Sequence, residues 1–91
     1  MPDNLEQRRK RLAFRARHRG MKELDLLIGS FAERHLAAFS PDQLDRFEAL
    51  LDLPEPLMYG WLVGGEAPPD DLDNDVLTLL LNFKYLPQRL D

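Results

Sequence analysis

The sequence turns from one predicted helix to the next at Arg19-Gly20-Met21-Lys22-Glu23, between a basic amphipathic segment and an apolar one. We expect the first helix to end at Arg19, because Gly20 can take the left-handed conformation that closes a helix without steric cost. Met21 then begins the second helix, with Glu23 in its first turn, where the helix dipole favours a carboxylate. Arg19 and Glu23 are therefore expected to lie close together at a corner between two helices.

This corner also has a purely structural interpretation. An arginine at the end of one helix, a glycine after it and a glutamate at the start of the next helix are ordinary capping residues. Taken alone, the five residues do not assign a function.

Two predicted helices flank the corner. Residues 5–18 carry a narrow apolar stripe, made by Leu5, Leu12 and Ala16 with Ala13 or the stem of Arg9, so this helix should lie on a core rather than inside it. Residues 21–37 have a wider apolar face and should form the central helix. Gly29 lies in the middle of this helix, which predicts close approach of a neighbouring helix there.

The start of a third helix has the clearest local signal. Ser40 is placed as the N-cap, with Pro41 at the first helical position and Gln43 at the third, which is a capping box with proline in its favoured place. Phe39, before the cap, can pack against Leu44. These residues predict a helix over 41–51.

Prolines and glycines divide the remaining sequence into two shorter helices. Pro56 can start a fourth helix that runs through Leu62 and ends at Gly64-Gly65. A cluster of aspartates then precedes a fifth helix, which Pro87 ends and whose apolar face is Leu72, Val76, Leu79, Leu80 and Phe83. The predicted fold is all-α: a compact five-helix bundle with short loops, one domain over 1–91, with an ordered core of about 5–86.

Composition excludes several classes of protein. The 91 residues contain no cysteine, which excludes disulfides, thiolate metal sites and cysteine nucleophiles, and two histidines are too few to favour a structural zinc site. No apolar run approaches the ~20 residues that span a bilayer, and the polar start lacks the apolar region of a signal peptide. We expect a cytoplasmic bacterial protein that does not insert into membranes and is a monomer when free.

The few reactive side chains have structural explanations. Ser40 is explained as a cap, and Ser30 and Thr78 lie within helices. His35 is on an apolar face, where a packing histidine is more common than a catalytic one, and His18 should be a solvated neighbour of the corner. The sequence has no glycine-rich phosphate-binding loop, so no independent catalytic site is predicted.

Aromatic residues outside the predicted core are candidates for binding a partner. Trp61 shares a helical face with Met58 and is predicted to be core. Tyr59 is expected to project off that face, and Phe14 lies on the opposite face of its helix from Leu12, where it could anchor a partner.

Three blocks of the sequence resemble one family. Residues 19–25 (RGMKELD) are similar to the Arg-Gly-x-x-Glu signature of the small assembly factors that help attach FAD covalently to the flavoprotein subunit of succinate dehydrogenase. The bacterial members are the SdhE-type FAD assembly factors. Residues 39–51 (FSPDQLDRFEALL) resemble the family's third helix, and 50–62 (LLDLPEPLMYGWL) resemble its Trp-Leu segment. The resemblance spans about residues 8–85, although the last block lacks the family's second acid and has Gly60 in place of asparagine.

The resemblance implies a five-helix bundle that is a maturation factor rather than an enzyme. Its partner would be the flavoprotein subunit of succinate dehydrogenase or of fumarate reductase. The chain would act on the FAD of that partner and would bind no cofactor stably itself. Arg19 and Glu23 would make charged contacts, and Gly20 would let the backbones approach. The predicted partner-binding residues are those of the motif and its neighbours: Arg15, His18, Arg19, Gly20, Met21 and Glu23, with the aromatic side chains Phe14 and Tyr59.

Binding of nucleic acid is the alternative. Eight of the 12 lysines and arginines lie within residues 8–22, and a basic helix on a small bundle can bind phosphates. Against this, the net charge is -4 and most acidic residues follow Ser40, so much of the surface would repel DNA or RNA. An acidic protein partner and a simple solvated face are the other interpretations of the basic segment.

Overall fold

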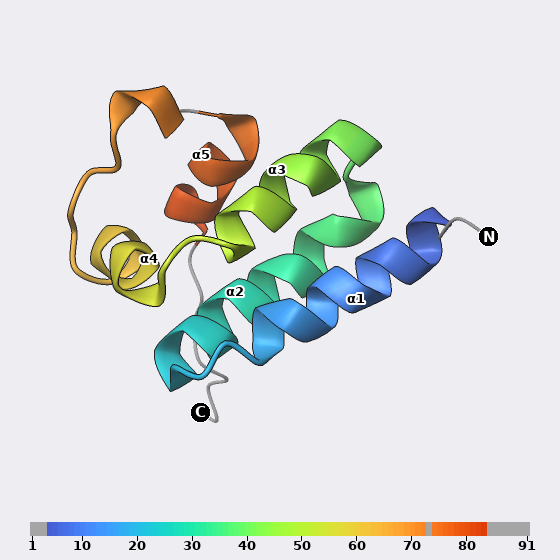
Figure 1. The fold of residues 1–91 in the computed structure, drawn as a ribbon, viewed down its shortest axis with the longest axis horizontal. Helices are drawn as coiled ribbons and strands as arrows, with labels where there is room; N and C mark the ends of the chain where they lie inside the picture. The colour runs from blue at the N-terminus through green and yellow to red at the C-terminus, as the bar shows by residue number, and fades with distance from the viewer. Residues whose placement is uncertain (1–3, 73, 84–91) are drawn as a thin grey trace, which may run out of the picture.

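The computed structural model describes residues 4–72 and 74–83, and this part of the chain is all-α, as predicted. Its α-helices are α1 (Leu5–Arg17), α2 (Lys22–His35), α3 (Pro41–Leu51), α4 (Glu55–Leu62) and α5 (Asp75–Asn82), with short 3₁₀ turns at Leu36–Ala38 and Asp70–Leu72. In Figure 1, α1 and α2 lie side by side and antiparallel, α3 packs along them, and α4 and α5 lie beyond α3. The predicted stretch 84–86 and Pro87 lie outside the described residues.

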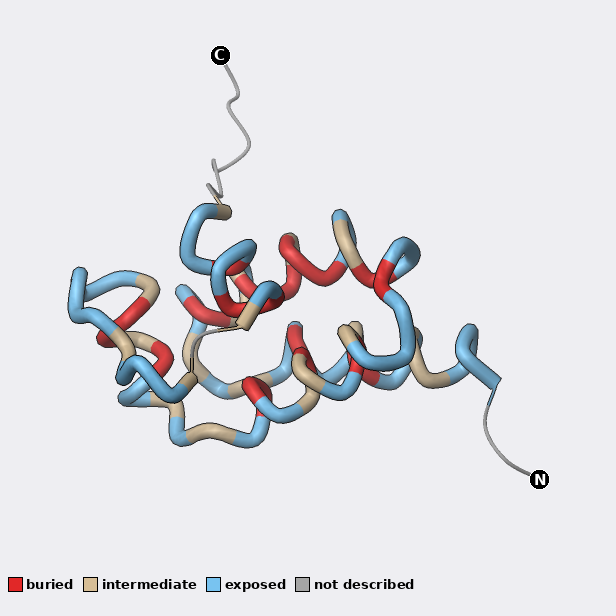
Figure 2. Tube along the Cα trace, turned by 90° about the horizontal axis from the view of Figure 1, so that it is seen from above, coloured by how far each residue is buried: buried red, intermediate tan, exposed pale blue. Residues whose placement is uncertain are grey.

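The core lies between the helix layers, where the buried positions of Figure 2 face one another. Among the described residues, seventeen apolar ones are buried: Leu12, Ala16, Leu24, Ile28, Phe31, Ala32, Leu36, Phe39, Leu44, Phe47, Leu50, Leu51, Met58, Trp61, Val76, Leu77 and Leu80. The prediction that Trp61 is core is therefore confirmed. Every described α-helix contributes to this single cluster, so no helix could bury its apolar face alone.

The first helix is shorter than predicted and buries less. Asn4 caps it by accepting a hydrogen bond from the backbone N–H of Gln7, and the helix ends at Arg17, two residues before the expected end. Leu5, expected in the apolar stripe, is 38% exposed. The reason is its place in the first turn, beyond the bundle, whereas Leu12 and Ala16 face α2 and are buried.

The second helix also differs at its end. It was predicted to reach Ala37, but it stops at His35 and tightens into the 3₁₀ turn. Arg9 of α1 donates to the carbonyl oxygens of Leu36 and Phe39, at 2.7 and 2.9 Å, which satisfies acceptors that a helix end leaves open. These bonds hold the α2–α3 connection against α1.

Gly29 has the role that the sequence predicted. A Cβ atom built on Gly29 would lie 2.8 Å from Cγ of Arg17 in α1, which is too close for van der Waals contact. The glycine therefore permits the close packing of α1 against α2.

The capping box of α3 is confirmed. The hydroxyl of Ser40 accepts from the N–H of Gln43 at 3.2 Å, and the amide oxygen of Gln43 accepts from the N–H of Ser40 at 3.0 Å. Phe39 and Leu44 are both buried in the core, as the predicted staple requires.

The fifth helix begins later than the aspartate cluster suggested. Asn74 is its N-cap, accepting from the N–H of Leu77 at 2.7 Å, so the helix starts at Asp75. Val76 and Leu80 are buried as predicted, but the side of the helix that packs inward next to them carries Leu77 and not Leu79, so the prediction of Leu79 as core was wrong. Asp75 bonds Gln43 and Arg46 of α3, and these bonds lower the pKa of its carboxyl group.

Candidate docking site at the α1–α2 turn

The turn between α1 and α2 contains the motif glycine in a left-handed conformation. Gly20 has φ +101°, a value that side chains other than glycine's strongly disfavour. A Cβ built there would meet nothing closer than Oε2 of Glu55 at 3.9 Å, so the restriction is the dihedral angle and not the space. Because α1 ends at Arg17, the glycine lies within the turn and not directly after the last helical residue.

The side chain of Arg19 points into the protein. Its side chain is 6% exposed, and its guanidinium donates to the carbonyl oxygens of Leu51 at 2.9 Å and Leu53 at 3.3 Å. Its Nε lies 3.9 Å from Oε2 of Glu55 and is buried without a hydrogen-bond partner among the described residues. Arg19 therefore connects the turn between α1 and α2 (residues 18–21, the motif turn) to the end of α3 and the start of α4.

Asp25 holds the backbone of the same turn. Its Oδ1 accepts the N–H of Arg19 at 2.7 Å, from the first turn of α2. Sequence reasoning quoted Asp25 but assigned it no role, and it missed Glu55 as a neighbour of Arg19. An acid in the first helical turn is too common a feature to have identified Asp25.

Glu23 is the motif residue that faces solvent. It is exposed in the first turn of α2, and no hydrogen bond or ion pair of its carboxylate is found within the described residues. Arg19 and Glu23, expected to lie close together at this corner, form no ion pair in the described structure, and the acids that contact Arg19 are Glu55 and Asp25. The reason is that Arg19 turns toward the open carbonyls at the end of α3, which a buried guanidinium can satisfy.

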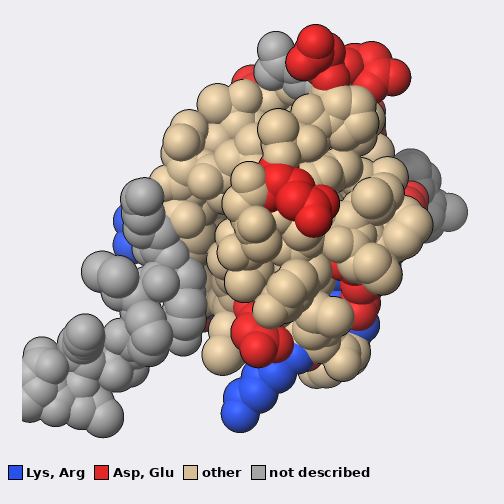
Figure 3. All heavy atoms as spheres, turned by 90° about the vertical axis from the view of Figure 1, so that its left-hand side faces the viewer, with Lys and Arg blue, Asp and Glu red and all other residues tan. Residues whose placement is uncertain are grey.

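An apolar groove lies next to Glu23. Leu26, Leu27 and Val63 line it with Glu23, and its volume is about 220 Å³. The groove is formed between the first half of α2 and the end of α4. In Figure 3, the side of the molecule that carries α4 is largely uncharged, with separate acidic groups and a basic side chain that extends from its lower edge. Sequence reasoning missed this groove, because it joins residues that are far apart in the chain.

Phe14 and His18 form an exposed aromatic pair at the other side of the turn. Phe14 is 56% exposed, its ring stacks on His18 with centroids 4.0 Å apart, and Nδ1 of His18 lies 2.7 Å from the carbonyl oxygen of Phe14. Arg15 is placed differently, because it bonds Asp52 at 2.7 Å and lies 3.7 Å from Glu48. Phe14 and His18 remain available for a partner, whereas Arg15 has acidic neighbours within the chain.

Met21 and Tyr59 are less exposed than a free contact residue would be. Both are half-buried and pack against the core. Tyr59 was expected to project off the apolar face of α4, and it packs against that core instead. Their predicted contacts with a partner are not tested by this geometry and stay predictions.

Three arginines of the basic first helix pair with acids of the same chain. Arg8 bonds Asp45 at 2.6 Å and Glu48 at 2.9 Å, which raises the pKa of Arg8, and Arg17 pairs with Glu33 at 2.7 Å. With Arg15 and Arg9, four of its arginines bind groups of α2, α3 or the connection between them. This pairing leaves the nucleic-acid alternative without support.

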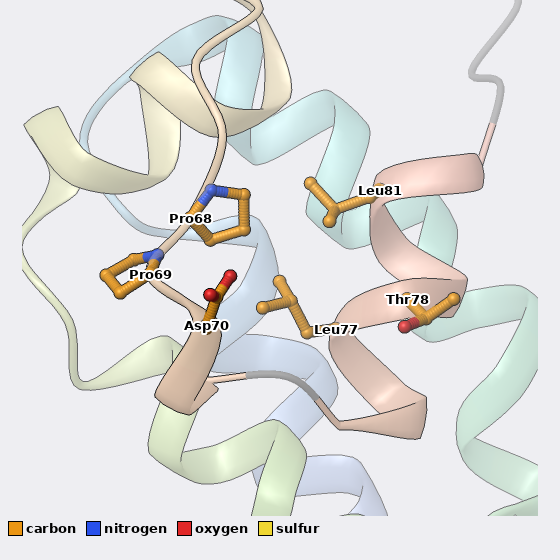
Figure 4. A pocket seen from close by; sticks show the side chains of 6 residues that line it. All are labelled: Pro68, Pro69, Asp70, Leu77, Thr78 and Leu81. Atoms are coloured by element: carbon orange, nitrogen blue, oxygen red, sulfur yellow. The ribbon is translucent and has the colours of Figure 1, made fainter.

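A second hollow lies far from the motif. It measures about 240 Å³ and separates the Pro68–Asp70 segment from Leu77, Thr78 and Leu81 of α5 (Figure 4). Its lining contains one carboxylate, Asp70, and one hydroxyl, Thr78, but no histidine, lysine or other base that could activate that hydroxyl. In the described part of the chain, no three His, Cys, Asp or Glu residues are grouped so that they could hold a metal ion. No described helix is long and apolar enough to cross a membrane.

Comparison with known proteins identifies the family. Residues 10–84 match the model of the family described as "Flavinator of succinate dehydrogenase". The chain belongs to this family. The match includes the whole motif turn, both sides of the groove and the α3–α4 connection that Arg19 binds.

Curated relatives agree with the family match. The chain is 42% identical over 69 residues to the FAD assembly factor SdhE of Acetobacter pasteurianus, covering 76% of this chain and 63% of that protein. It is 34% identical over 76 residues to the mitochondrial succinate dehydrogenase assembly factor 2 of Dictyostelium discoideum, covering 84% of this chain and 54% of that protein. The chain thus spans between about half and two-thirds of the length of these relatives.

Proposed function

We propose that this protein binds the flavoprotein subunit of succinate dehydrogenase and promotes covalent attachment of FAD to that subunit. Family membership supports this proposal, and of the two relatives one is named as a FAD assembly factor and the other as a succinate dehydrogenase assembly factor. The protein is a maturation factor and not an enzyme. It holds no cofactor stably and acts on the FAD of its partner. The corresponding subunit of fumarate reductase is a second partner, and the factor is a monomer in the bacterial cytoplasm.

The observation that carries the proposal is the state of Glu23. Its carboxylate is exposed and unpaired in the described structure, while Arg19, Asp25 and Glu55 hold the turn that precedes it. A charged group fixed on a rigid turn needs little ordering when it binds, so it suits the recognition of a positively charged surface. Gly20 leaves no side chain at the tip of the turn, which lets the partner's backbone approach.

The contribution of this chain is positioning. FAD supplies the reactive chemistry, and the described residues offer no catalytic group beside the turn. The factor binds the flavoprotein near the flavin site. It thereby holds the flavoprotein in a geometry in which a side chain of the flavoprotein can react with the flavin. Restricting the relative motion of two reacting groups in this way can accelerate their reaction strongly.

The test uses a strain that lacks the gene. Its proteins are separated on a denaturing gel, and covalent flavin is read as fluorescence of the large dehydrogenase subunit. We expect the band to be lost, to return with the wild-type gene, and to stay about tenfold weaker or more with Glu23→Ala, because a charged contact at the interface is removed.

A matched control separates docking from helix stability. Asp42 is exposed at the second position of α3, the same helical position that Glu23 has in α2. Asp42→Ala loses the same favourable interaction with a helix dipole, about 0.3–1 kcal/mol, and should restore the band fully. An unchanged band in the strain without the gene would contradict the proposed function. If Glu23→Ala and Asp42→Ala weakened the fluorescent band equally, the role of Glu23 would be structural and not in docking.

A further inference from the structure

We propose that the groove lined by Leu26, Leu27 and Val63 receives an apolar side chain of the flavoprotein subunit, and that a lysine or arginine beside that side chain pairs with Glu23. This inference rests on the proposed function and adds a surface and the chemistry of its occupant. The groove lies outside the motif turn, because Val63 follows α4 and Leu26 and Leu27 belong to the second turn of α2.

The lining of the groove favours an apolar occupant. Leu26 and Val63 are each 45% exposed, so an apolar side chain of α2 and one at the C-cap of α4 face solvent at one place. Covering such surface is favourable in proportion to the apolar area removed from water. The volume of about 220 Å³ lies below the roughly 300–1,000 Å³ of small-molecule sites, so the groove suits one side chain and not a cofactor.

The charge at the groove favours a cation next to that apolar side chain. Glu48, Asp52 and Glu33 are all paired with arginines of α1, whereas Glu23 has no such partner among the described residues. Lys22 does not compensate it, because side chains at neighbouring helical positions point in different directions. Glu23 is also the charged residue in the lining of the groove, so a cation from the partner would neutralise the charge at this place.

Both sides of the groove are fixed before binding. Leu26 and Leu27 lie within α2, and Asp25, the residue before them, binds the motif turn. The end of α4 is closed by bonds from the N–H groups of Val63 and Gly64 to the carbonyl oxygen of Tyr59, at 2.8 and 3.0 Å. A preformed groove loses little conformational freedom when it is filled, so its apolar contact contributes fully to affinity.

The experiment measures binding of the purified factor to the purified flavoprotein subunit by calorimetry, and the rate of covalent flavin attachment with excess FAD. The variants are Leu26→Ser, Val63→Ser and Glu23→Gln. Leu79→Ser is the control, because Leu79 is a similarly exposed leucine, 38% accessible, on α5 and away from the groove. Melting temperatures establish that every variant, including the Leu26→Lys variant used below, is folded.

We expect Leu26→Ser and Val63→Ser each to raise the dissociation constant about tenfold, and Leu79→Ser to change it less than about twofold. Glu23→Gln should weaken binding and also remove most of its dependence on salt concentration, because the screened charge pair is gone. Leu26→Lys should weaken binding more than Leu26→Ser, since it places a cation against the partner's cation.

Two results would overturn the inference while leaving the proposed function intact. In the first, Leu26→Ser and Val63→Ser bind as the wild type does, although Glu23→Gln remains impaired. In the second, they alter self-association of the factor, measured by sedimentation, and not its binding to the flavoprotein, which would make a second copy of this chain the occupant. Failure of the wild-type factor to bind the flavoprotein or to accelerate flavin attachment would overturn both proposals.

Discussion

At the scale of single residues, the motif divides into internal and external members. Arg19 binds two carbonyl groups inside the protein, and Glu23 faces outward without a partner in the described structure. The two charges of the motif therefore act differently. Arg19 fixes the turn, and Glu23 is the charge that the fixed turn presents. We expect a substitution of either residue to impair the proposed docking, but only that of Arg19 should also destabilise the fold.

Arg19→Lys tests the internal role. A lysine ammonium cannot reach both Leu51 and Leu53 with the fork geometry of a guanidinium, so one carbonyl loses its donor. We expect the free energy of unfolding to fall by about 1–3 kcal/mol in urea titrations. Arg34→Lys is the control, since Arg34 is exposed on α2. Equal stability of the two variants would contradict the role of Arg19 in the turn.

His35 gives a prediction on pH dependence. Its ring packs against Phe31 and Phe39, with centroids 4.6 and 5.9 Å away. Burial, and secondarily the charge of Arg34, lower the pKa of His35 below its ordinary value of 6.5. The unfolded chain then binds more protons than the folded one in this range, so the free energy of unfolding should decrease as the pH falls through 6.5 and below.

The measurement is urea unfolding at a series of pH values from 8 to about 5, above the range in which most carboxylates titrate. His35→Gln should be less stable at pH 8 but should show a flatter dependence on pH. A slope that is the same in the wild type and in His35→Gln would mean that His35 does not titrate differently on folding.

At the scale of elements, the contact between α1 and α2 limits the size of the side chain that fits at the position of Gly29. Alanine at this position should gain about 1 kcal/mol of helix propensity, but its Cβ would meet Cγ of Arg17. We expect Gly29→Ala to give no gain in stability in the wild-type background. In an Arg17→Ala background, where Cγ is absent, the same substitution should stabilise by about 1 kcal/mol.

Thermal unfolding of the four proteins of this cycle measures the coupling between the two positions. Additive effects would show that α1 can move away from α2 without cost, contrary to the close packing described here. Loss of the exposed ion pair between Arg17 and Glu33 is common to both Arg17→Ala proteins and cancels in the comparison.

At the scale of the whole molecule, one core of modest size holds all the described helices. Trp61 is 7% exposed and joins α4 to that core. Trp61→Ala should cost about 3–5 kcal/mol, a large part of the roughly 5–15 kcal/mol typical of folded domains. The melting temperature should therefore fall by at least about 12 °C, whereas Trp61→Phe should lower it much less. An unchanged melting temperature in Trp61→Ala would place the ring at an interface and not in the core.

The sequence by itself determined the fold class, the capping box at Ser40, the left-handed Gly20, the close packing at Gly29 and the family of the chain. These features depend on residues that are near one another in the sequence, through helical periodicity, dihedral preferences and local hydrogen bonds. The ends of the helices, and which positions of each helix face the core, were less predictable. Leu79 was wrongly placed in the core because both Leu77 and Leu79 lie beside the buried Val76 and Leu80 on the helix, and packing turned Leu77 inward.

The tertiary structure alone decided the partners of the charges and the shape of the docking site. Arg19 binds the carbonyl groups of Leu51 and Leu53, and arginines of α1 pair with acids of α2 and α3. The groove beside Glu23 exists because α4 ends next to α2. Long side chains can reach several partners from one backbone position, so local sequence does not choose among them. The choice is made when the helices pack and leave particular carbonyls, acids and apolar surfaces within reach.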